Sequence, residues 1–178
     1  MKQASRFMPK YTHPKSESRI IIWAVMAVLG TGFILFVWNF PLLLLLIPVI
    51  AGWSYFENKR TKLKFEALAE ERRELSICEF ARSFDCYKTD TWVIRAVYEQ
   101  IQEYVSYIDS PPAIKASDDL FKVLEIDDED LDLDLVWEIL QRTGRSTDST
   151  ESNPYYGKVR TVQDFVNFIN SQPLIERT

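Results

Sequence analysis

The stretch IIIWAVMAVLGTGFILFVWNFPLLLLLIPVIAGWSYF, residues 20–56, decides the fold of this chain. No charged side chain occurs in it, and only Asn39, Phe40 and Pro41 interrupt its apolar character. As a helix, residues 20–38 would measure roughly 28 Å, close to the ~30 Å hydrocarbon core of a bilayer. Residues 40–56 form a second stretch at the lower limit of spanning length. The sequence therefore predicts a transmembrane hairpin with spans over 20–38 and 40–56.

Two other interpretations of this stretch stay open. A cleaved signal peptide fits poorly, because the apolar stretch is too long and no small-x-small cleavage site precedes a polar region. A re-entrant or interfacial helix is the alternative for the second half. Pro48 is expected to kink that half, which a bilayer tolerates when neighbours satisfy the freed backbone groups.

Basic residues on both sides of the hairpin predict its orientation. The turn carries none, so the positive-inside rule places both termini in the cytoplasm, at the inner membrane. Cys78 and Cys86 are too few for a disulfide scaffold, and we expect them to be reduced. The flanking basic residues are Lys2, Arg6, Lys10, Lys15 and Arg19 before the hairpin, and Lys59, Arg60, Lys62 and Lys64 after it.

Charge divides the chain into two parts of opposite sign. Residues 1–64 have a net charge of +7, whereas residues 65–178 have −12, within a total of −5. The basic part suits anionic lipid head groups of the cytoplasmic leaflet. The acidic part disfavours nucleic acid and suits a basic protein partner.

The chain divides into four segments on these grounds. A basic tail covers residues 1–19 and the hairpin covers 20–56. Residues 57–83 contain no Gly or Pro, which predicts a helix continuing from the second span; a solvated spacer and a coiled-coil strand both remain possible for it. Residues 84–178 form a small acidic domain, and no run in it alternates like a strand. The predicted fold class is all-α.

Four helical signals occur in the acidic domain. Asp90 or Thr91 can begin a helix that continues to Tyr107. Ser117 can cap a short turn over residues 118–124. A second long helix is expected to begin within residues 128–132 and to end near Gly144, and Thr161 can cap the last. Their expected apolar faces are Val93, Val97, Ile101, Tyr104, Val105 and Ile108; then Leu133, Val136, Trp137, Ile139 and Leu140; then Val162, Phe165, Val166 and Ile169.

This order of helices, with the segment VRTVQDFVNFI at residues 159–169, resembles the acyl carrier proteins. Thr161 would cap the family's final helix, and the run Asp130-Leu131-Asp132-Leu133-Asp134 resembles the approach to its second helix. The resemblance covers residues ~90 to ~172. The chain is also similar to a group of uncharacterised bacterial proteins with a degenerate acyl-carrier-like fold. It implies a small helical bundle that presents an acidic helix to partner enzymes.

The attachment serine of that family is missing. The family carries phosphopantetheine on Ser in an Asp-Ser-Leu motif, where this chain has Asp130 or Asp132, each followed by Leu. No Ser occurs between Asp118 and Arg145, and a carboxylate cannot form the phosphodiester. Ser117 and Ser146 lack the motif around them. We therefore expect no cofactor.

Ten acidic residues and one base, Lys122, occupy residues 117–138. A calcium loop would require a Gly in its turn, which is absent, and a catalytic carboxylate pair would require a partner that the sequence does not display. A recognition face for a basic partner is the favoured interpretation, and an ordinary solvated face is the alternative. The predicted partner-binding residues are Asp127, Asp128, Glu129, Asp130, Asp132 and Asp134.

The residue inventory disfavours an enzyme. The single histidine, His13, lies in the tail, and no Ser-His-Asp, Cys-His, zinc or dinucleotide pattern occurs. The leading hypothesis is a membrane-anchored, cytoplasm-facing acyl-carrier-like interaction module without a prosthetic group, whose partner would be a lipid- or acyl-handling enzyme. The alternatives are a working acyl carrier that serves a membrane enzyme and a small membrane immunity or stress protein.

Overall fold

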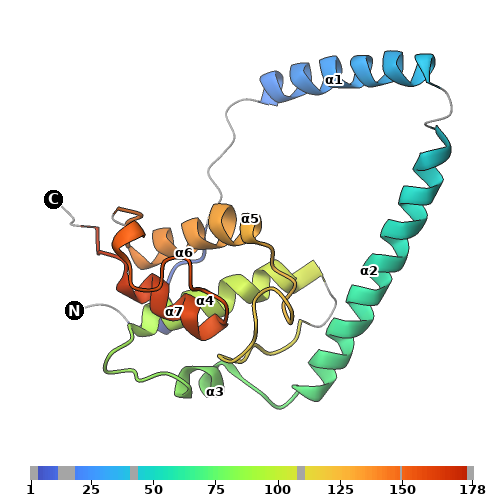
Figure 1. Cartoon of the computed structure of the whole chain (residues 1–178). Coiled ribbons are helices and arrows are strands. Elements are labelled where there is room, and N and C mark those ends of the chain that lie inside the picture. Colours follow the sequence, from blue (N-terminus) through green and yellow to red (C-terminus); the bar gives the residue numbers. More distant parts are fainter. Residues whose placement is uncertain (1–3, 12–18, 41–43, 108–110, 149, 176–178) are drawn as a thin grey trace. The chain divides into compact units, whose positions relative to one another are not determined.

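The structure is a computed structural model that describes residues 4–11, 19–40, 44–107, 111–148 and 150–175 (Figure 1). The chain clusters into two compact units. The apolar unit is Thr12–Lys64, and the acidic unit combines Met1–Tyr11 with Phe65–Thr178. Within the described ranges all regular elements are helices. Two isolated β-bridges also occur, one between Asp119 and Thr161 and one between Arg145 and Leu174. The all-α prediction is confirmed.

Helix α1 (Arg19–Asn39) is the one helix in the described part of the chain that is long and apolar enough to cross a membrane, over Ile22–Asn39. Large apolar side chains such as Trp23 and Phe36 are exposed around it, a pattern typical of a helix in lipid or in a protein core. Its polar side chains are satisfied locally. Thr31 Oγ1 donates to the Ala27 carbonyl and Asn39 Nδ2 to the Leu35 carbonyl, both at 2.8 Å.

Helix α2 (Leu46–Glu71) differs from the predicted second span. It begins at Leu46 rather than at residue 40, and residues 41–43 lie outside the described ranges. Its apolar part ends at Phe56, so it measures only roughly 16 Å, about half of a hydrocarbon core. Pro48 lies in the first turn of α2, where a backbone N–H makes no hydrogen bond within the helix. The lack of an N–H at Pro48 therefore gives no reason for the predicted kink.

A helix does continue from the second apolar stretch, but the predicted continuity over residues 57–83 is wrong, because α2 ends at Glu71 and a separate helix α3 (Ile77–Arg82) follows. Arg72 turns into the interior of the acidic unit, and the Leu75 N–H donates to the Arg72 carbonyl at 2.9 Å. Ser76 then begins α3 with a capping box that includes Glu79. The Ser-x-x-Glu pattern at 76–79 was the overlooked signal for this second start.

Helix α4 (Thr91–Tyr104) begins as predicted, with the Asp90 carboxylate accepting from the Trp92 N–H at 2.9 Å. It passes into the short 3-10 turn η3 (Val105–Tyr107) instead of continuing as α-helix. The predicted face at Val93, Val97 and Ile101 is buried, as is Val105. Ile108 lies outside the described residues.

The predicted second long helix is interrupted by a π-helical turn. It comprises α5 (Asp128–Asp130), the π-helix η4 (Leu131–Leu135) and α6 (Val136–Thr143). One wider turn rotates the inward face of the helix, because each π turn holds about one residue more than an α turn. Leu135 and Ile139 face the core, whereas Trp137, expected inside, is 56% exposed. The helix ends at the predicted place, where Gly144 forms the C-cap of α6 in the left-handed region at φ 67°.

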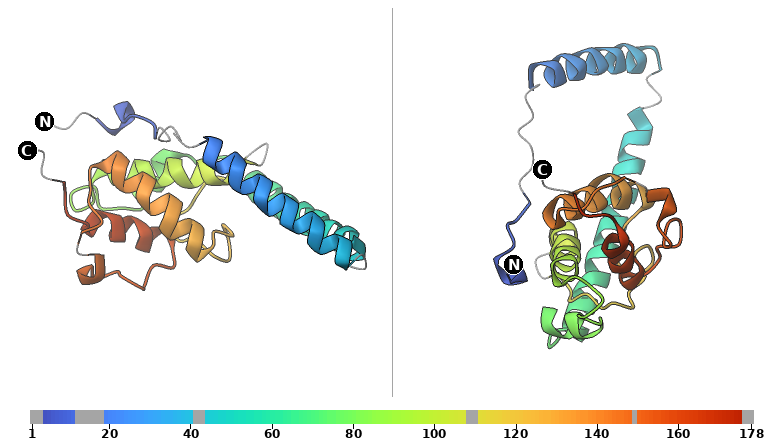
Figure 2. Two further views of the ribbon diagram at one scale, coloured as in Figure 1. Left: turned by 90° about the horizontal axis from the view of Figure 1, so that it is seen from above. Right: turned by 90° about the vertical axis from the view of Figure 1, so that its left-hand side faces the viewer.

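Helix α7 (Val162–Ser171) follows the short 3-10 turn η5 (Thr150–Ser152) and completes the core. Thr161 caps α7 as predicted, since its side chain accepts from the Asp164 N–H at 3.1 Å. Val162, Phe165, Val166 and Ile169 are all buried. Helix α4 packs against both α6 and α7, and these three helices form the body of the acidic unit (Figure 2).

The acidic unit is discontinuous in sequence. The 3-10 turn η1 (Ser5–Phe7) contacts α4, and the Met8 side chain is buried in the same hydrophobic cluster as Phe65 and Phe165. The apolar unit is therefore an insertion between residue 11 and residue 65 of one compact unit. The sequence prediction treated residues 1–19 only as a basic tail and missed this packing.

Candidate interaction surface

The acidic residues of 117–138 separate into a structural set and an exposed set. Asp118 and Asp119 are used by the fold, and Glu138 accepts a hydrogen bond from Gln100 on α4. Asp127, Glu129 and Asp134 are exposed. Exposed residues are accessible to a partner, although Asp127 also accepts a hydrogen bond from the Asp130 N–H.

The predicted recognition face lies along α5 and η4. Asp127 precedes α5, and its Oδ1 accepts from the Asp130 N–H at 2.7 Å. Asp130 is half-buried, with its carboxylate accepting from the Tyr104 hydroxyl. Asp128 and Asp132 lie in these helices, but their side chains lie outside the described set. The structure thus places Asp127, Glu129 and Asp134 on the surface and ties Asp130 to α4.

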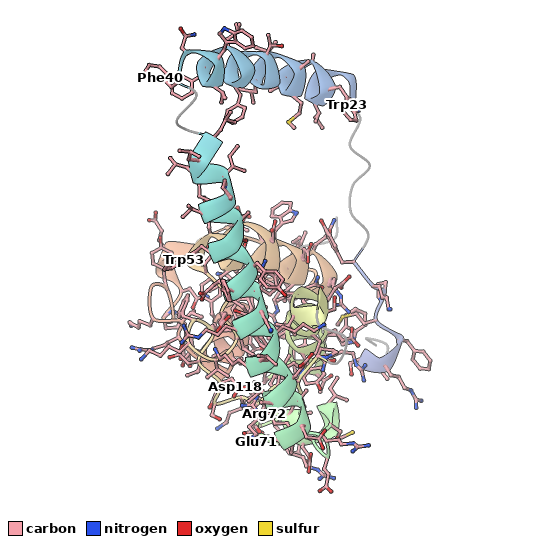
Figure 3. All side chains as sticks on the ribbon, turned by 90° about the vertical axis from the view of Figure 1, so that its right-hand side faces the viewer. Trp23, Phe40, Trp53, Glu71, Arg72 and Asp118 are labelled. Carbon is pink, nitrogen blue, oxygen red and sulfur yellow. The ribbon has the colours of Figure 1, made fainter. Side chains whose placement is uncertain are left out.

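Asp118 forms a buried ion pair with Arg72. The two guanidinium nitrogens of Arg72 donate to the two carboxylate oxygens at 2.6 and 2.8 Å (Figure 3). Arg72 also donates to the Ala113 carbonyl at 3.0 Å, and the Lys115 N–H donates to Asp118 at 2.8 Å. This bidentate pair joins the residue that follows α2 to the loop before residue 120. Asp118 is therefore structural and not part of a partner surface.

Asp119 caps the turn that was assigned to Ser117. Its Oδ1 accepts from the N–H groups of Phe121 and Lys122 at 3.1 and 3.0 Å, and Arg160 donates to its other oxygen at 3.1 Å. The hydrogen bond from the Lys122 N–H is the main cause that lowers the pKa of Asp119, and the Arg160 contact acts in the same direction. Residues 118–124 form turns and no helix, and Ser117 is exposed.

The basic residues of α6 and its end face inward. Arg142 donates to the side chains of Glu99 and Gln100 on α4. Arg145 donates to the carbonyls of Asn170 and Gln172 at 2.8 and 2.6 Å. Burial lowers the pKa of Arg145, and nearby Asp90 opposes that shift. Since both guanidinium groups are occupied inside the unit, they do not neutralise the acidic surface.

A groove lies at the C-terminal end of α6. Its volume is about 180 Å³, and it is lined by Trp137, Leu140, Gln141, Arg145, Ser146, Thr147 and Ile175. Ile175 is 55% exposed, and the neighbouring Leu174 is 54% exposed. Residues 144–146 and 173–175 are paired by hydrogen bonds from the Ser146 N–H to the Pro173 carbonyl and from the Ile175 N–H to the Gly144 carbonyl, both 2.9 Å.

The groove could not be found from the sequence. It combines α6 with a strand-like segment about 30 residues further along the chain, and neither segment signals the other. The prediction that placed Trp137 on the same inward face as Ile139 is wrong, because two residues along an α-helix turn the side chain by roughly 200°. Tyr155 packs against the core, whereas Tyr156 is exposed.

The side chains considered for covalent or metal chemistry are Ser146, Cys78 and Cys86. Ser146 Oγ donates to Asp148 at 2.7 Å on the surface, outside any helix. No group of three His, Cys, Asp or Glu side chains among the described residues is arranged to hold a metal ion. Cys78 and Cys86 are exposed and unpaired with each other.

These features define a small all-α unit with an exposed acidic helix and an adjoining apolar groove, attached to a strongly apolar helix. Comparison with known proteins adds no family: no family description, curated protein or solved structure matches the chain.

Proposed function

We propose that this chain is a membrane-anchored adaptor whose acidic unit faces the cytoplasm and binds a basic protein partner, without a prosthetic group. One observation carries the proposal. Residues 4–11 and residues 65–175 belong to one compact unit, and the apolar unit is inserted between them. A chain that leaves a folded unit and returns to it must cross the bilayer an even number of times. This supports a hairpin over a single span.

Two spans would use α1 and the first part of α2. The apolar part of α2 is short, so Lys59 and Arg60 would extend their side chains towards the head groups to lengthen the span. The turn after Asn39 would then lie on the far side. The basic residues before α1 and after Phe56 support a cytoplasmic location for both ends of the hairpin.

The partner assignment rests on charge and exposure. Asp127, Glu129 and Asp134 are exposed on the surface, whereas Arg142 and Arg145 are buried in hydrogen bonds. The proposed acyl-carrier-like arrangement takes α4 as its first helix, α5 to α6 as its second, η5 as its short helix and α7 as its last. In that arrangement the acidic helix would receive basic residues of the partner.

Membrane topology is tested by thiol labelling in intact cells of the native host. Cys78 and Cys86 are exposed and report on the acidic unit, while Asn39→Cys and Ser5→Cys, each in a Cys78→Ser/Cys86→Ser background, report on the turn and the N-terminal segment. A membrane-impermeant maleimide should label Asn39→Cys from outside and the others only after permeabilisation. External labelling of Ser5→Cys would refute the hairpin. An Asn39→Cys thiol that is protected from the external maleimide would indicate a re-entrant hairpin instead of two spans.

Partner binding is tested by charge reversal. The triple change Asp127→Lys, Glu129→Lys and Asp134→Lys should reduce in-cell crosslinking to the partner at least tenfold, because it replaces attraction by repulsion across the contact. The matched control Glu70→Lys, Glu74→Lys and Glu103→Lys alters net charge equally at exposed positions elsewhere. Equal losses in both triple variants would show that only the net charge of the chain matters.

The absence of a prosthetic group is tested by the intact mass of the full-length protein. A mass above that of the bare chain by one phosphopantetheine would overturn that part of the proposal.

A further inference from the structure

The groove at the end of α6 is large enough to hold one large side chain. A cavity of roughly 150 Å³ admits benzene, so a groove of about 180 Å³ can receive one branched or aromatic side chain. Trp137 lines it and remains 56% exposed, and Ile175 contributes another exposed apolar surface. Tryptophan at such a position is typical of the energetic centre of a protein interface.

Two exposed acidic residues lie close in sequence to residues that line the groove. Asp134 lies three residues before Trp137, at the passage from η4 to α6, and both side chains are exposed. Asp148 is exposed directly after Thr147, which lines the groove. The one basic lining residue, Arg145, directs its guanidinium to backbone carbonyls inside the unit. Asp148 accepts a hydrogen bond from the lining residue Ser146, so among the described residues the groove has a carboxylate at its edge and a lining that includes Trp137, Leu140 and Ile175.

We propose that this groove binds a short segment of a protein partner, with one large apolar residue placed against Trp137 and Ile175 and basic residues on both sides of it. The inference rests on the proposed function and names the chemistry of the partner segment. Apolar anchoring supplies affinity, and the two carboxylates select basic flanks and their register. These carboxylates disfavour anionic lipid head groups as occupants.

The groove is tested by photo-crosslinking in the native host with the full-length chain. Benzoylphenylalanine replaces Trp137 in one variant, Glu129 in a second and the fully exposed Tyr87 in a third. Crosslinking from position 137 should exceed that from position 87 at least tenfold. The crosslinked segment, sequenced by mass spectrometry, should contain Lys or Arg on both sides of a large apolar residue. Ile175→Ser should reduce the yield from position 137 about tenfold, whereas Tyr156→Ser, an equally exposed residue outside the groove, should not.

The outcomes separate this inference from the proposed function. Capture of the partner from position 129 but not from 137 would retain the acidic recognition face and overturn the groove. Crosslinks from position 137 to lipid, to a second copy of the chain or to an acidic segment would also overturn it. No capture from either position 129 or 137 would overturn both proposals.

Discussion

Asp118→Ala should destabilise the acidic unit by about 3–5 kcal/mol, because it leaves the buried Arg72 guanidinium without its carboxylate. The pair is bidentate and both side chains are buried. Hydrogen exchange of the α4 and α7 amides, measured by mass spectrometry on the full chain in detergent micelles, should accelerate by roughly 10²- to 5 × 10³-fold. These peptides report on the acidic unit alone.

Arg73 provides the matched control for this prediction. Its pair with Glu70 is exposed and long, at 3.8 Å, so Arg73→Ala should change exchange by less than about fivefold. A double change, Arg72→Met with Asp118→Leu, should recover much of the lost protection, because it removes both charges together. Equal effects of Asp118→Ala and Arg73→Ala would show that the pair contributes no more than a surface contact.

Phe65→Ala should cost about 3–5 kcal/mol by leaving a cavity in the core of the acidic unit. Phe65 lies on α2, yet its side chain is fully buried and belongs to the same cluster as Phe165. The last turns of α2 are therefore part of the core and not a spacer. Urea denaturation followed by near-ultraviolet circular dichroism should show a lower midpoint with little change in slope.

Leu63 is two residues away on the same helix and is exposed, which makes Leu63→Ala the control for Phe65→Ala. It removes a side chain of comparable character without creating a cavity, so the midpoint should shift little. A midpoint unchanged by Phe65→Ala would mean that α2 contributes nothing to the core, as a solvated spacer helix requires.

Local chemistry made the helix ends of the acidic unit predictable. The caps at Asp90 and Thr161 and the left-handed Gly144 depend on residues within a few positions, and all three are as expected. The buried face of α7 follows from its 3.6-residue pattern. Long-range contacts decided the features that sequence periodicity missed.

Two examples show how those contacts act. The helix propensity of Arg72 would allow α2 to continue, but its hydrogen bonds with Asp118 draw it into the unit directly after α2 ends at Glu71. Met8 reaches a core built almost entirely from residues beyond 65, and nothing in the basic tail indicates that position.

The buried Met8 also imposes an order on biosynthesis. The N-terminal segment leaves the ribosome first but can take its place only after residues 65–175 follow, on the order of 10–30 s later at usual rates of translation. Closing so long a loop in a free chain costs entropy. A hairpin of the proposed kind brings its two ends together at one face of the bilayer before the core exists. The membrane would then act as a folding template for the unit that it anchors.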